Sequence, residues 1–491
     1  MLFLRKIFFF LFVAIYAFCC PLLILYGLGY IYKPGAEQGI VKSGLIYLST
    51  APSGASVYLS NRRYTRKTPV VLPGLLPGDY QVRLILKNNR PWEQILPVEA
   101  GKATVLEKIL LLPEKWKREI LSLEPFEDLV SIPGTRFFLL SKGTKAKYFF
   151  IYDWKEDKVR PLFPENFSFL DYKVLSHFQV KESPAFLLRV GNETEENFFW
   201  IVPRKEEIQI KDITSLFSEK PRQIEWDPQA KKYLFAFQND YLNRINLSLN
   251  TTEPKFLDRI RGYGLFEKKL YILRSNNTFE QMDLDGKWEK LLLRDPALGG
   301  SLFGTKGNYQ VKVFSDDIIL FLGEKGELLG NRLPYRFIEE GVLGLEFYPK
   351  LKRVLIWKKD ALGILDFSKQ RSELGEKEVF ETGPKLIWVF KKGEKIEQAF
   401  WVYEGSHILF QDKNKVFLLE LETYGKPHLN FLVEVKRKSS IFYSEESGKL
   451  YYIDSITGNP TSMEILPRWE ILTLPFPERK EEKKKAEIGE L

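Results

Sequence analysis

The strongest constraint in the sequence is an uncharged, apolar stretch that runs from Ile7 to Tyr32. Arg5 and Lys6 precede this stretch, and Lys33 follows it. As an α-helix it would rise about 39 Å, which exceeds the roughly 30 Å hydrocarbon core of a bilayer. Because a helix satisfies its own backbone hydrogen bonds in lipid, the sequence predicts a transmembrane anchor over residues 7–32.

Two other interpretations of the stretch stay open. A cleaved signal peptide has a shorter apolar core followed by small residues, and Gly27-Leu28-Gly29 is a passable cleavage site. A lipoprotein would use Cys19 or Cys20, although the bulky Phe18 stands where a small residue is expected before Cys19. The length of the apolar run favours an uncleaved anchor over both.

The basic residues give an orientation for the anchor. Arg5 and Lys6 lie in the short N-terminal segment, and basic residues near a membrane helix stay cytoplasmic. We therefore expect residues 1–6 inside a bacterial cytoplasmic membrane and the bulk of the chain periplasmic or extracellular.

The composition excludes several classes of protein. The net charge of +9 is spread over 73 basic and 64 acidic residues, and we find no dense basic stripe outside the C-terminal tail, so we expect no nucleic-acid partner. Both cysteines lie in the apolar stretch, which excludes disulfides and thiolate metal sites from the rest of the chain. With 44% hydrophobic and 14% aromatic residues, the chain is expected to fold and to be rich in strands.

A small β domain is expected next to the membrane, after a linker over residues 33–43. Residues 44–50, 55–59 and 80–86 alternate apolar and polar side chains, as strands do. Turn signals with proline and glycine separate them. Residues 44–113 therefore predict a small β-sandwich.

The motifs of this region resemble the PEGA domain. The family's tetrad stands here as Pro52-Ser53-Gly54-Ala55, with serine in place of glutamate, and a Thr-Pro pair and a Pro-Gly-x-Tyr element follow. The resemblance covers Gly44 to Leu112 and implies an extracytoplasmic β-sandwich without catalysis. The residues that carry it are expected to set turns and core positions: Pro52, Gly54, Ala55, Thr68, Pro69, Pro77, Gly78 and Tyr80.

Residues 114–476 read as a repeat of roughly 45 residues. Each copy has an apolar strand, a turn, a second strongly apolar strand, a polar turn and a third strand. Clear copies lie at 223–247, 344–367 and 400–421, and weaker copies begin near Leu129, Val174, Gly264, Tyr309 and Ser440. The period predicts a 7–8-bladed β-propeller, so the whole chain is expected to be all-β after its anchor. Stacked sandwiches and a β-solenoid are the alternatives, and their usual repeat lengths fit less well.

Two further segments complete the organisation. Residues 115–123 are the best helical candidate after the anchor, although they could be only a connector. Residues 477–491 form a charged tail that is expected to be solvated.

A search for catalytic chemistry gives no assignable site. There is no Gly-x-Ser-x-Gly elbow and no metal-binding motif, so no catalytic, cofactor-binding or metal residues are expected, and no cofactor. Ser406 and His407 are adjacent, but neighbours on a strand point to opposite faces, so we expect no dyad. Asp316 and Asp317 are one of many carboxylate pairs that could serve a glycosidase.

Two functions remain in view. The first is a non-enzymatic, membrane-anchored binding or scaffold protein that presents its propeller to an envelope protein or glycan. The second is an extracytoplasmic hydrolase of glycans or peptides, with carboxylates at the propeller mouth.

Overall fold

The structure is a computed structural model of the chain. It describes residues 2–27, 29–32, 39–132, 135–143, 147–164, 168–169, 171–178, 185–191, 196–204, 207–226, 233–294, 303, 307–330, 337–368, 385–421, 424 and 427–466. The chain divides into two compact units, the first formed by Met1–Trp116 with Ile465–Leu491 and the second by Lys117–Glu464.

The first unit begins with the helix α1 (Leu2–Gly27), which contains Pro21. Its window Ile7–Gly27 is long and apolar enough to cross a membrane, and none of it is buried against the rest of the protein. The helix ends earlier than expected, because the chain turns at Gly29, whose φ is +86°. Part of the predicted anchor forms β1 (Tyr30–Tyr32) instead, and part of the predicted linker forms its antiparallel partner β2 (Ile40–Lys42).

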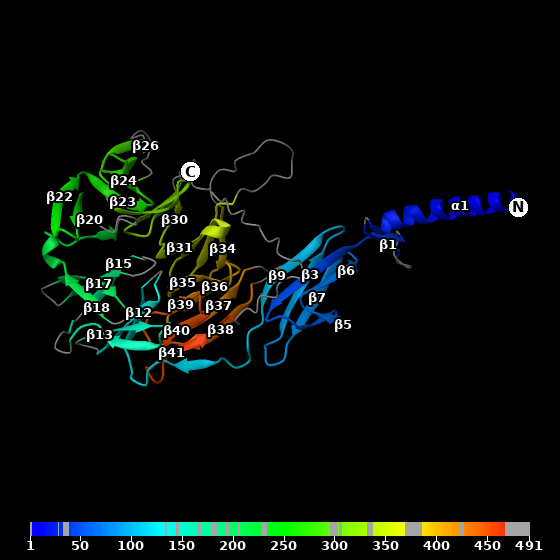
Figure 1. The fold of residues 1–491 in the computed structure, drawn as a ribbon, viewed down its shortest axis with the longest axis horizontal. Coiled ribbons are helices and arrows are strands. Elements are labelled where there is room, and N and C mark those ends of the chain that lie inside the picture. The colour runs from blue at the N-terminus through cyan, green and yellow to red at the C-terminus, as the bar shows by residue number, and fades with distance from the viewer. Residues whose placement is uncertain are drawn as a thin grey trace, which may run out of the picture. The chain divides into compact units, whose positions relative to one another are not determined.

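The rest of the first unit is a pair of sheets around one apolar core (Figure 1). One sheet has the order β6-β3-β9 and the other the order β5-β4-β7-β8. Apolar residues at every second position of these strands are buried, as in Ile46 and Leu48, which gives a core between the two sheets. The strands are β3 (Gly44–Ala51), β4 (Ser56–Leu59), β5 (Arg62–Lys67), β6 (Val70–Leu75), β7 (Gly78–Ile85), β8 (Trp92–Val98) and β9 (Ala103–Leu110).

The second unit contains eight antiparallel sheets of four strands in its described residues. Seven use four strands that are consecutive in sequence. The eighth joins three C-terminal strands to β10, from the start of the unit, in the order β10-β41-β40-β39. Two short 3-10 helices, η1 (Thr214–Leu216) and η2 (Pro349–Leu351), lie in connections.

The first sheet contains β11 (Asp128–Ser131), β12 (Phe137–Lys142), β13 (Tyr148–Asp153) and β14 (Lys158–Pro161), and the second contains β15 (Asp171–Phe178), β16 (Ala185–Gly191), β17 (Glu196–Pro203) and β18 (Ile208–Asp212). The third sheet contains β19 (Gln223–Trp226), β20 (Tyr233–Gln238), β21 (Tyr241–Asn246) and β22 (Thr251–Leu257), and the fourth contains β23 (Ile260–Phe266), β24 (Lys269–Arg274), β25 (Thr278–Asp283) and β26 (Trp288–Arg294). The fifth sheet contains β27 (Tyr309–Ser315), β28 (Ile318–Gly323), β29 (Leu328–Gly330) and β30 (Phe337–Glu339), and the sixth contains β31 (Gly344–Tyr348), β32 (Arg353–Trp357), β33 (Leu362–Asp366) and β34 (Lys385–Phe390). The seventh sheet contains β35 (Ile396–Val402), β36 (His407–Asp412), β37 (Lys415–Glu420) and β38 (Leu429–Glu434), and the eighth contains β10 (Arg118–Ile120), β39 (Phe442–Ser444), β40 (Lys449–Ile453) and β41 (Pro460–Glu464).

Apolar cores connect most neighbouring sheets of the second unit, and hydrogen bonds connect the seventh sheet to the eighth. Six clusters join the first sheet to the second and so on to the seventh. The seventh and eighth sheets are linked by hydrogen bonds, in which Ile441 N donates to Gln398 Oε1 at 3.0 Å and Gln411 Nε2 donates to the Ser439 carbonyl at 2.9 Å. A further cluster joins the eighth sheet back to the first, through residues such as Phe138 of β12. The packing is therefore cyclic.

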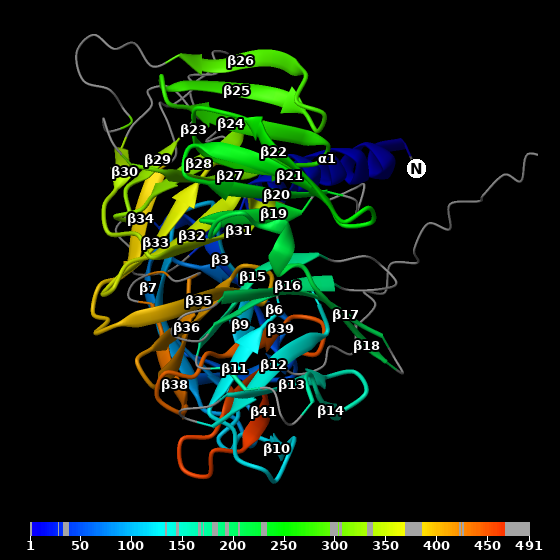
Figure 2. The ribbon, with the colours of Figure 1, turned by 90° about the vertical axis from the view of Figure 1, so that its left-hand side faces the viewer.

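The figures show the same succession. In Figure 1 the strands of the second unit follow one another from cyan through green and yellow to orange, and cyan β12 and β13 lie near orange β40 and β41. Figure 2 shows β11 and β12 beside β39 and β41 from the side, in agreement with the shared core of the first and eighth sheets. The first strands β15 and β19, β19 and β23, β23 and β27, and β31 and β35 contact each other, as do β11 and β39.

The repeat start points predicted from the sequence fall in these sheets. Each lies in the first strand of a different sheet, except Ser440, which precedes β39 by two residues. The second strand of each copy is strongly apolar because its sheet packs on both faces, as in β12, where only Lys142 is not fully buried. Residues 115–123 contain β10 instead of the expected helix, because pairing with β41 provides their backbone partners.

Candidate functional site

A pocket of about 430 Å³ lies in the second unit where the first strands of the third, fifth and sixth sheets begin. Those strands are β19, β27 and β31, and the β28–β29 turn completes the wall. The lining residues are Arg222, Gln223, Phe237, Asn308, Tyr309, Gln310, Leu322, Gly323, Glu324, Lys325, Gly326, Gly341, Val342 and Leu343.

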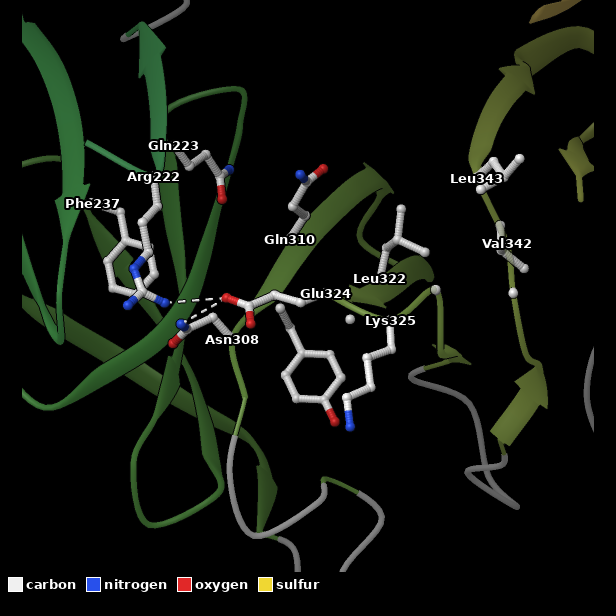
Figure 3. Close-up of a pocket in the computed structure, with 14 residues that line it drawn as sticks. Arg222, Gln223, Phe237, Asn308, Gln310, Leu322, Glu324, Lys325, Val342 and Leu343 are labelled. Atoms are coloured by element: carbon white, nitrogen blue, oxygen red, sulfur yellow. Dashed lines mark hydrogen bonds and ion pairs between the residues drawn. The ribbon is translucent and has the colours of Figure 1, made fainter. Parts of the chain in front are cut away.

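The polar side of the pocket is organised around Glu324 (Figure 3). Arg222 Nη1 donates to Glu324 Oε1 at 3.1 Å, and Asn308 Nδ2 donates to the same oxygen at 3.0 Å. Arg222 and Glu324 keep 48% and 58% of their side chains exposed, so the ion pair is solvated and contributes at most about 1 kcal/mol to stability. These groups can therefore exchange partners with a ligand at low cost.

The opposite wall is backbone. Val342 N donates to the Gly326 carbonyl at 2.9 Å. Gly326 has a φ of +83°, and a Cβ at this position would lie 2.8 Å from both the amide nitrogen and the carbonyl oxygen of Val342. The turn therefore needs glycine in order to approach the segment that leads into β31.

Polar side chains continue from the pocket along the first strands. Gln223 and Glu225 share one face of β19, and Gln310 and Lys312 share one face of β27, because side chains alternate along a strand. Gln223 Nε2 donates to Glu225 Oε1 at 2.7 Å, and Lys312 Nζ lies 4.0 Å from the same oxygen. Burial raises the pKa of the Glu225 carboxyl, while Lys312 and Gln223 lower it in part.

A second carboxylate, Glu346, lies on β31. Its Oε2 accepts a hydrogen bond from Trp401 N at 2.8 Å, and Trp401 Nε1 donates to the Glu346 carbonyl at 3.1 Å. The pKa of the Glu346 carboxyl is raised to about 7, chiefly by burial and to a smaller extent by Glu445, against the opposing effect of the Trp401 amide. Glu346 thus joins the sixth sheet to the seventh and can carry a proton near neutral pH.

The expectation that Ser406 and His407 point to opposite faces is wrong. Ser406 Oγ lies 2.9 Å from His407 Nδ1. Ser406 lies in the turn before β36, so strand alternation does not apply to it. Its hydroxyl also donates to the Tyr403 carbonyl at 2.7 Å. Ser406 and His407 are only 1% and 2% exposed, so no substrate can reach them and their hydrogen bond is structural.

The other candidate groups do not assemble into a site. Asp316 accepts a hydrogen bond from the Tyr271 hydroxyl at 3.0 Å in the turn between β27 and β28. Within the part of the chain that the structure describes, no three His, Cys, Asp or Glu side chains are placed to hold a metal ion.

The PEGA motif residues fall in two groups in the first unit. The first group contains Pro52, Gly54, Ala55, Thr68 and Pro69. The Thr68 Oγ1 lies 2.6 Å from Thr50 Oγ1 and accepts a hydrogen bond from Ala55 N at 3.0 Å. The peptide bonds before Pro52 and Pro69 are cis, and Gly54 between these elements has a φ of +88°. The second group contains Pro77, Gly78 and Tyr80. Gly78 is the first residue of β7, and the Tyr80 hydroxyl donates to the Leu76 carbonyl at 3.0 Å, which closes the loop that contains Pro77.

The geometry so far defines an all-β protein with an N-terminal apolar helix, a two-sheet domain and a cycle of four-stranded sheets. A comparison with protein-family models matches residues 43–111 to the PEGA domain, which confirms the resemblance. Among solved structures, the chain is similar to the β-propeller domain of Cps50 (Swd1) from Myceliophteria thermophila, with a TM-score of 0.39 and 9% identity over 72% of this chain and 98% of that one. No curated protein matches the sequence.

The pocket residues were not identified from the sequence. One signal for them exists in the repeats: Gln223 and Glu225 alternate with Ile224 and Trp226 in a strand whose other face is buried. Polar residues at every second position of a first strand indicate a face turned away from the apolar cores. The pairing of Arg222 with Glu324 has no such signal, because 102 residues separate them in sequence.

Proposed function

We propose that this protein is a single-pass, membrane-anchored envelope protein without enzymatic activity, whose second unit binds a protein or glycan. The observation that carries the proposal is the unburied helix α1, which precedes the PEGA domain in sequence and is joined to it by the β1–β2 pair. Ser43 N and Oγ both donate to the Gly29 carbonyl at 2.7 Å, so the residues after the helix are part of the folded unit, which favours an uncleaved anchor over a cleaved signal.

The orientation in this proposal follows the basic residues. Arg5 and Lys6 would stay in the cytoplasm, and the PEGA domain and the second unit would lie outside a bacterial cytoplasmic membrane. The PEGA domain would then act as a spacer or wall-proximal module.

The eight sheets are proposed to be the eight blades of a β-propeller. The succession of apolar cores, completed by the hydrogen bonds between the seventh and eighth sheets, supports this, since each blade of a propeller packs on two neighbours. The strand β10 completes the last sheet from the start of the unit, which ties the two ends of the cycle together. The pocket would then lie at one mouth of the central channel.

The pocket supports recognition of a neutral, polar ligand. Its volume is in the usual range for small-ligand sites. Arg222, Asn308 and Gln310 lie near Glu324, and the charged lining residues Arg222, Lys325 and Glu324 include both signs. Such groups match the hydroxyl groups of a sugar residue or the amides of an extended peptide.

The binding proposal can be tested with the full-length protein in lipid nanodiscs, on a glycan array and by crosslinking in envelope extract. The double variant R222A/E324A should lose the captured ligand. The matched control K155A/E446A removes another exposed ion pair, with an Nζ–Oε1 distance of 2.7 Å, and should retain it. Loss of binding in both variants, or no ligand for the wild-type chain, would contradict the proposal.

A second candidate function, hydrolysis of glycans or peptides, is favoured by one observation. The pKa of Glu346 near 7 is suited to a general acid, and Glu225 on β19 is a second carboxyl whose pKa burial raises. Turnover of a glycan or peptide panel by the wild-type protein, abolished in E346Q and E225Q, would support this function. Binding without turnover would support the first.

A further inference from the structure

The strand β5 gives the PEGA domain a strongly basic edge. It reads Arg-Arg-Tyr-Thr-Arg-Lys, and all its residues except Tyr64 are exposed. It forms an outer strand of the sheet β5-β4-β7-β8, as its label in Figure 1 shows. We call its four cations, Arg62, Arg63, Arg66 and Lys67, the basic edge.

The basic edge has no ion-pair partner among the residues that the structure describes. Within residues 44–112 there are nine basic and four acidic residues, and none of the acidic residues lies on β5. Ion pairs elsewhere in the domain join Arg83 to Glu93 and Lys102 to Glu99, but no described residue forms an ion pair with the basic edge. Charges on an edge strand also prevent edge-to-edge pairing, yet that task does not need four charges of one sign. The arrangement fits an anionic partner.

The junction with α1 keeps the domain at the membrane surface. The β1–β2 hairpin brings Lys42 opposite Tyr30, three residues after the last residue of the helix. Ser43 is hydrogen-bonded to Gly29, and β3 begins at the next residue. The domain therefore starts at the end of the membrane helix and is not held on a long tether.

The strand register places the start of the basic edge toward this end of the domain. Gly44 packs against Val98, which pairs with Gly78 at the start of β7. Arg62 pairs with Leu59, and Leu59 pairs with Val82, four residues along β7 from Gly78. Four residues of a strand span about 13 Å. Arg62 and Arg63 are therefore the cations of the basic edge closest to the junction.

We propose that the basic edge binds the anionic phospholipid headgroups of the bilayer that holds α1. The proposal rests on the proposed function, because it requires α1 to be in the bilayer. Each basic residue near an anionic surface strengthens binding about fivefold, and the effect falls off within a Debye length. Contact would fix the orientation of the PEGA domain on the membrane.

Hydrogen–deuterium exchange of the full-length protein in nanodiscs tests the proposal. One set of nanodiscs contains phosphatidylcholine alone, and the other contains about a third phosphatidylglycerol. We expect amides of residues 60–67 to exchange about tenfold more slowly in the anionic nanodiscs, and this difference to vanish in high salt. Amides of the buried strand β3 should not change, which verifies the fold.

Two variants separate a site from a general charge effect. R62Q/R63Q/R66Q/K67Q should show no dependence on lipid charge. The control K87Q/R90Q/K108Q removes three cations toward the other end of the same domain and should keep the tenfold difference. Equal loss in both variants, or no lipid dependence in the wild-type protein, would overturn the inference. If the wild-type chain inserts in nanodiscs but β5 stays unprotected, only this inference fails; if it does not insert, the proposed anchor fails as well.

Discussion

Replacing Thr68 with valine removes a hydroxyl from the interior of the PEGA domain and leaves the shape of the side chain nearly unchanged. Thr68 and Thr50 are each 3% exposed, so water cannot replace a lost partner. The Thr68 hydroxyl accepts from Ala55 N at 3.0 Å and shares a 2.6 Å hydrogen bond with Thr50 Oγ1. In T68V the Ala55 amide therefore loses this acceptor, while Thr50 keeps its hydrogen bond to the Pro52 carbonyl.

The magnitude follows from these contacts. A buried donor without a partner costs about 1–3 kcal/mol, and loss of the hydroxyl pair costs about 1 kcal/mol more. The added methyl group returns at most about 0.8 kcal/mol. We expect T68V to lower the free energy of unfolding of the PEGA domain by about 2 kcal/mol, from a total of roughly 3–10 kcal/mol for a domain of this size.

Native-state hydrogen exchange measures this change in the full-length protein. A loss of about 2 kcal/mol increases the opening equilibrium about 30-fold, so core amides of β3 and β9 should exchange about 30-fold faster. The control T68S keeps the hydroxyl and loses only a methyl group, so its effect should be about fivefold or less. Wild-type exchange in T68V, or a larger effect in T68S, would refute the role of the hydroxyl.

Two predictions concern the second unit and are measured by urea unfolding. In G262A the new Cβ would lie 2.1 Å from the Tyr309 carbonyl oxygen, so β23 and β27 must separate, and we expect the free energy of unfolding to fall by about 2–3 kcal/mol. In the control G330A the new Cβ meets only side chains, so the loss should be less than about 1 kcal/mol. Equal losses in the two variants would contradict the close approach of β23 and β27. For Glu346 the folded pKa of about 7 lies above the unfolded value of 4.5, so the folded unit holds a proton that the unfolded chain has released between these pH values. Stability should therefore fall by at most about 3 kcal/mol as the pH rises through this window, and E346Q, which can still accept the Trp401 amide, should remove the fall and be more stable than wild type at pH 8. A wild-type profile that is flat, or unchanged in E346Q, would contradict the assignment.

Local patterns in the sequence predicted most of the strand arrangement. The second strand of each repeat is apolar on both faces, as in Tyr233–Gln238, and this pattern follows from packing between two neighbouring sheets. The PEGA motif was recognisable because its turns need particular residues, such as Gly54 at a φ of +88°. These features depend on residues that are close together in sequence.

Features that depend on distant residues were not predicted. Residues 115–123 were the best helical candidate, with a connector as the alternative, because nothing near them shows that their partner is β41, more than 300 residues away. The Arg222–Glu324 pair of the pocket is hidden for the same reason. The expectation of no dense basic stripe outside the tail is wrong for β5, where the four cations are adjacent in sequence but their exposure and lack of ion pairs are visible only in the fold.

The position of the pocket is connected to the close packing of the fourth and fifth sheets. Gly262 and Gly264 lie two residues apart on β23, and a Cβ at either position would lie within 2.5 Å of a carbonyl oxygen of β27. Without side chains at these positions, the two first strands meet backbone to backbone. The pocket is lined by residues of the third, fifth and sixth sheets, while the fourth sheet contacts the same part of β27 from Arg261, which donates to the Gly307 carbonyl at 2.9 Å and lies over the Tyr309 ring. The glycine pair thus stabilises the strand β27, whose first residues, Tyr309 and Gln310, form part of the pocket wall.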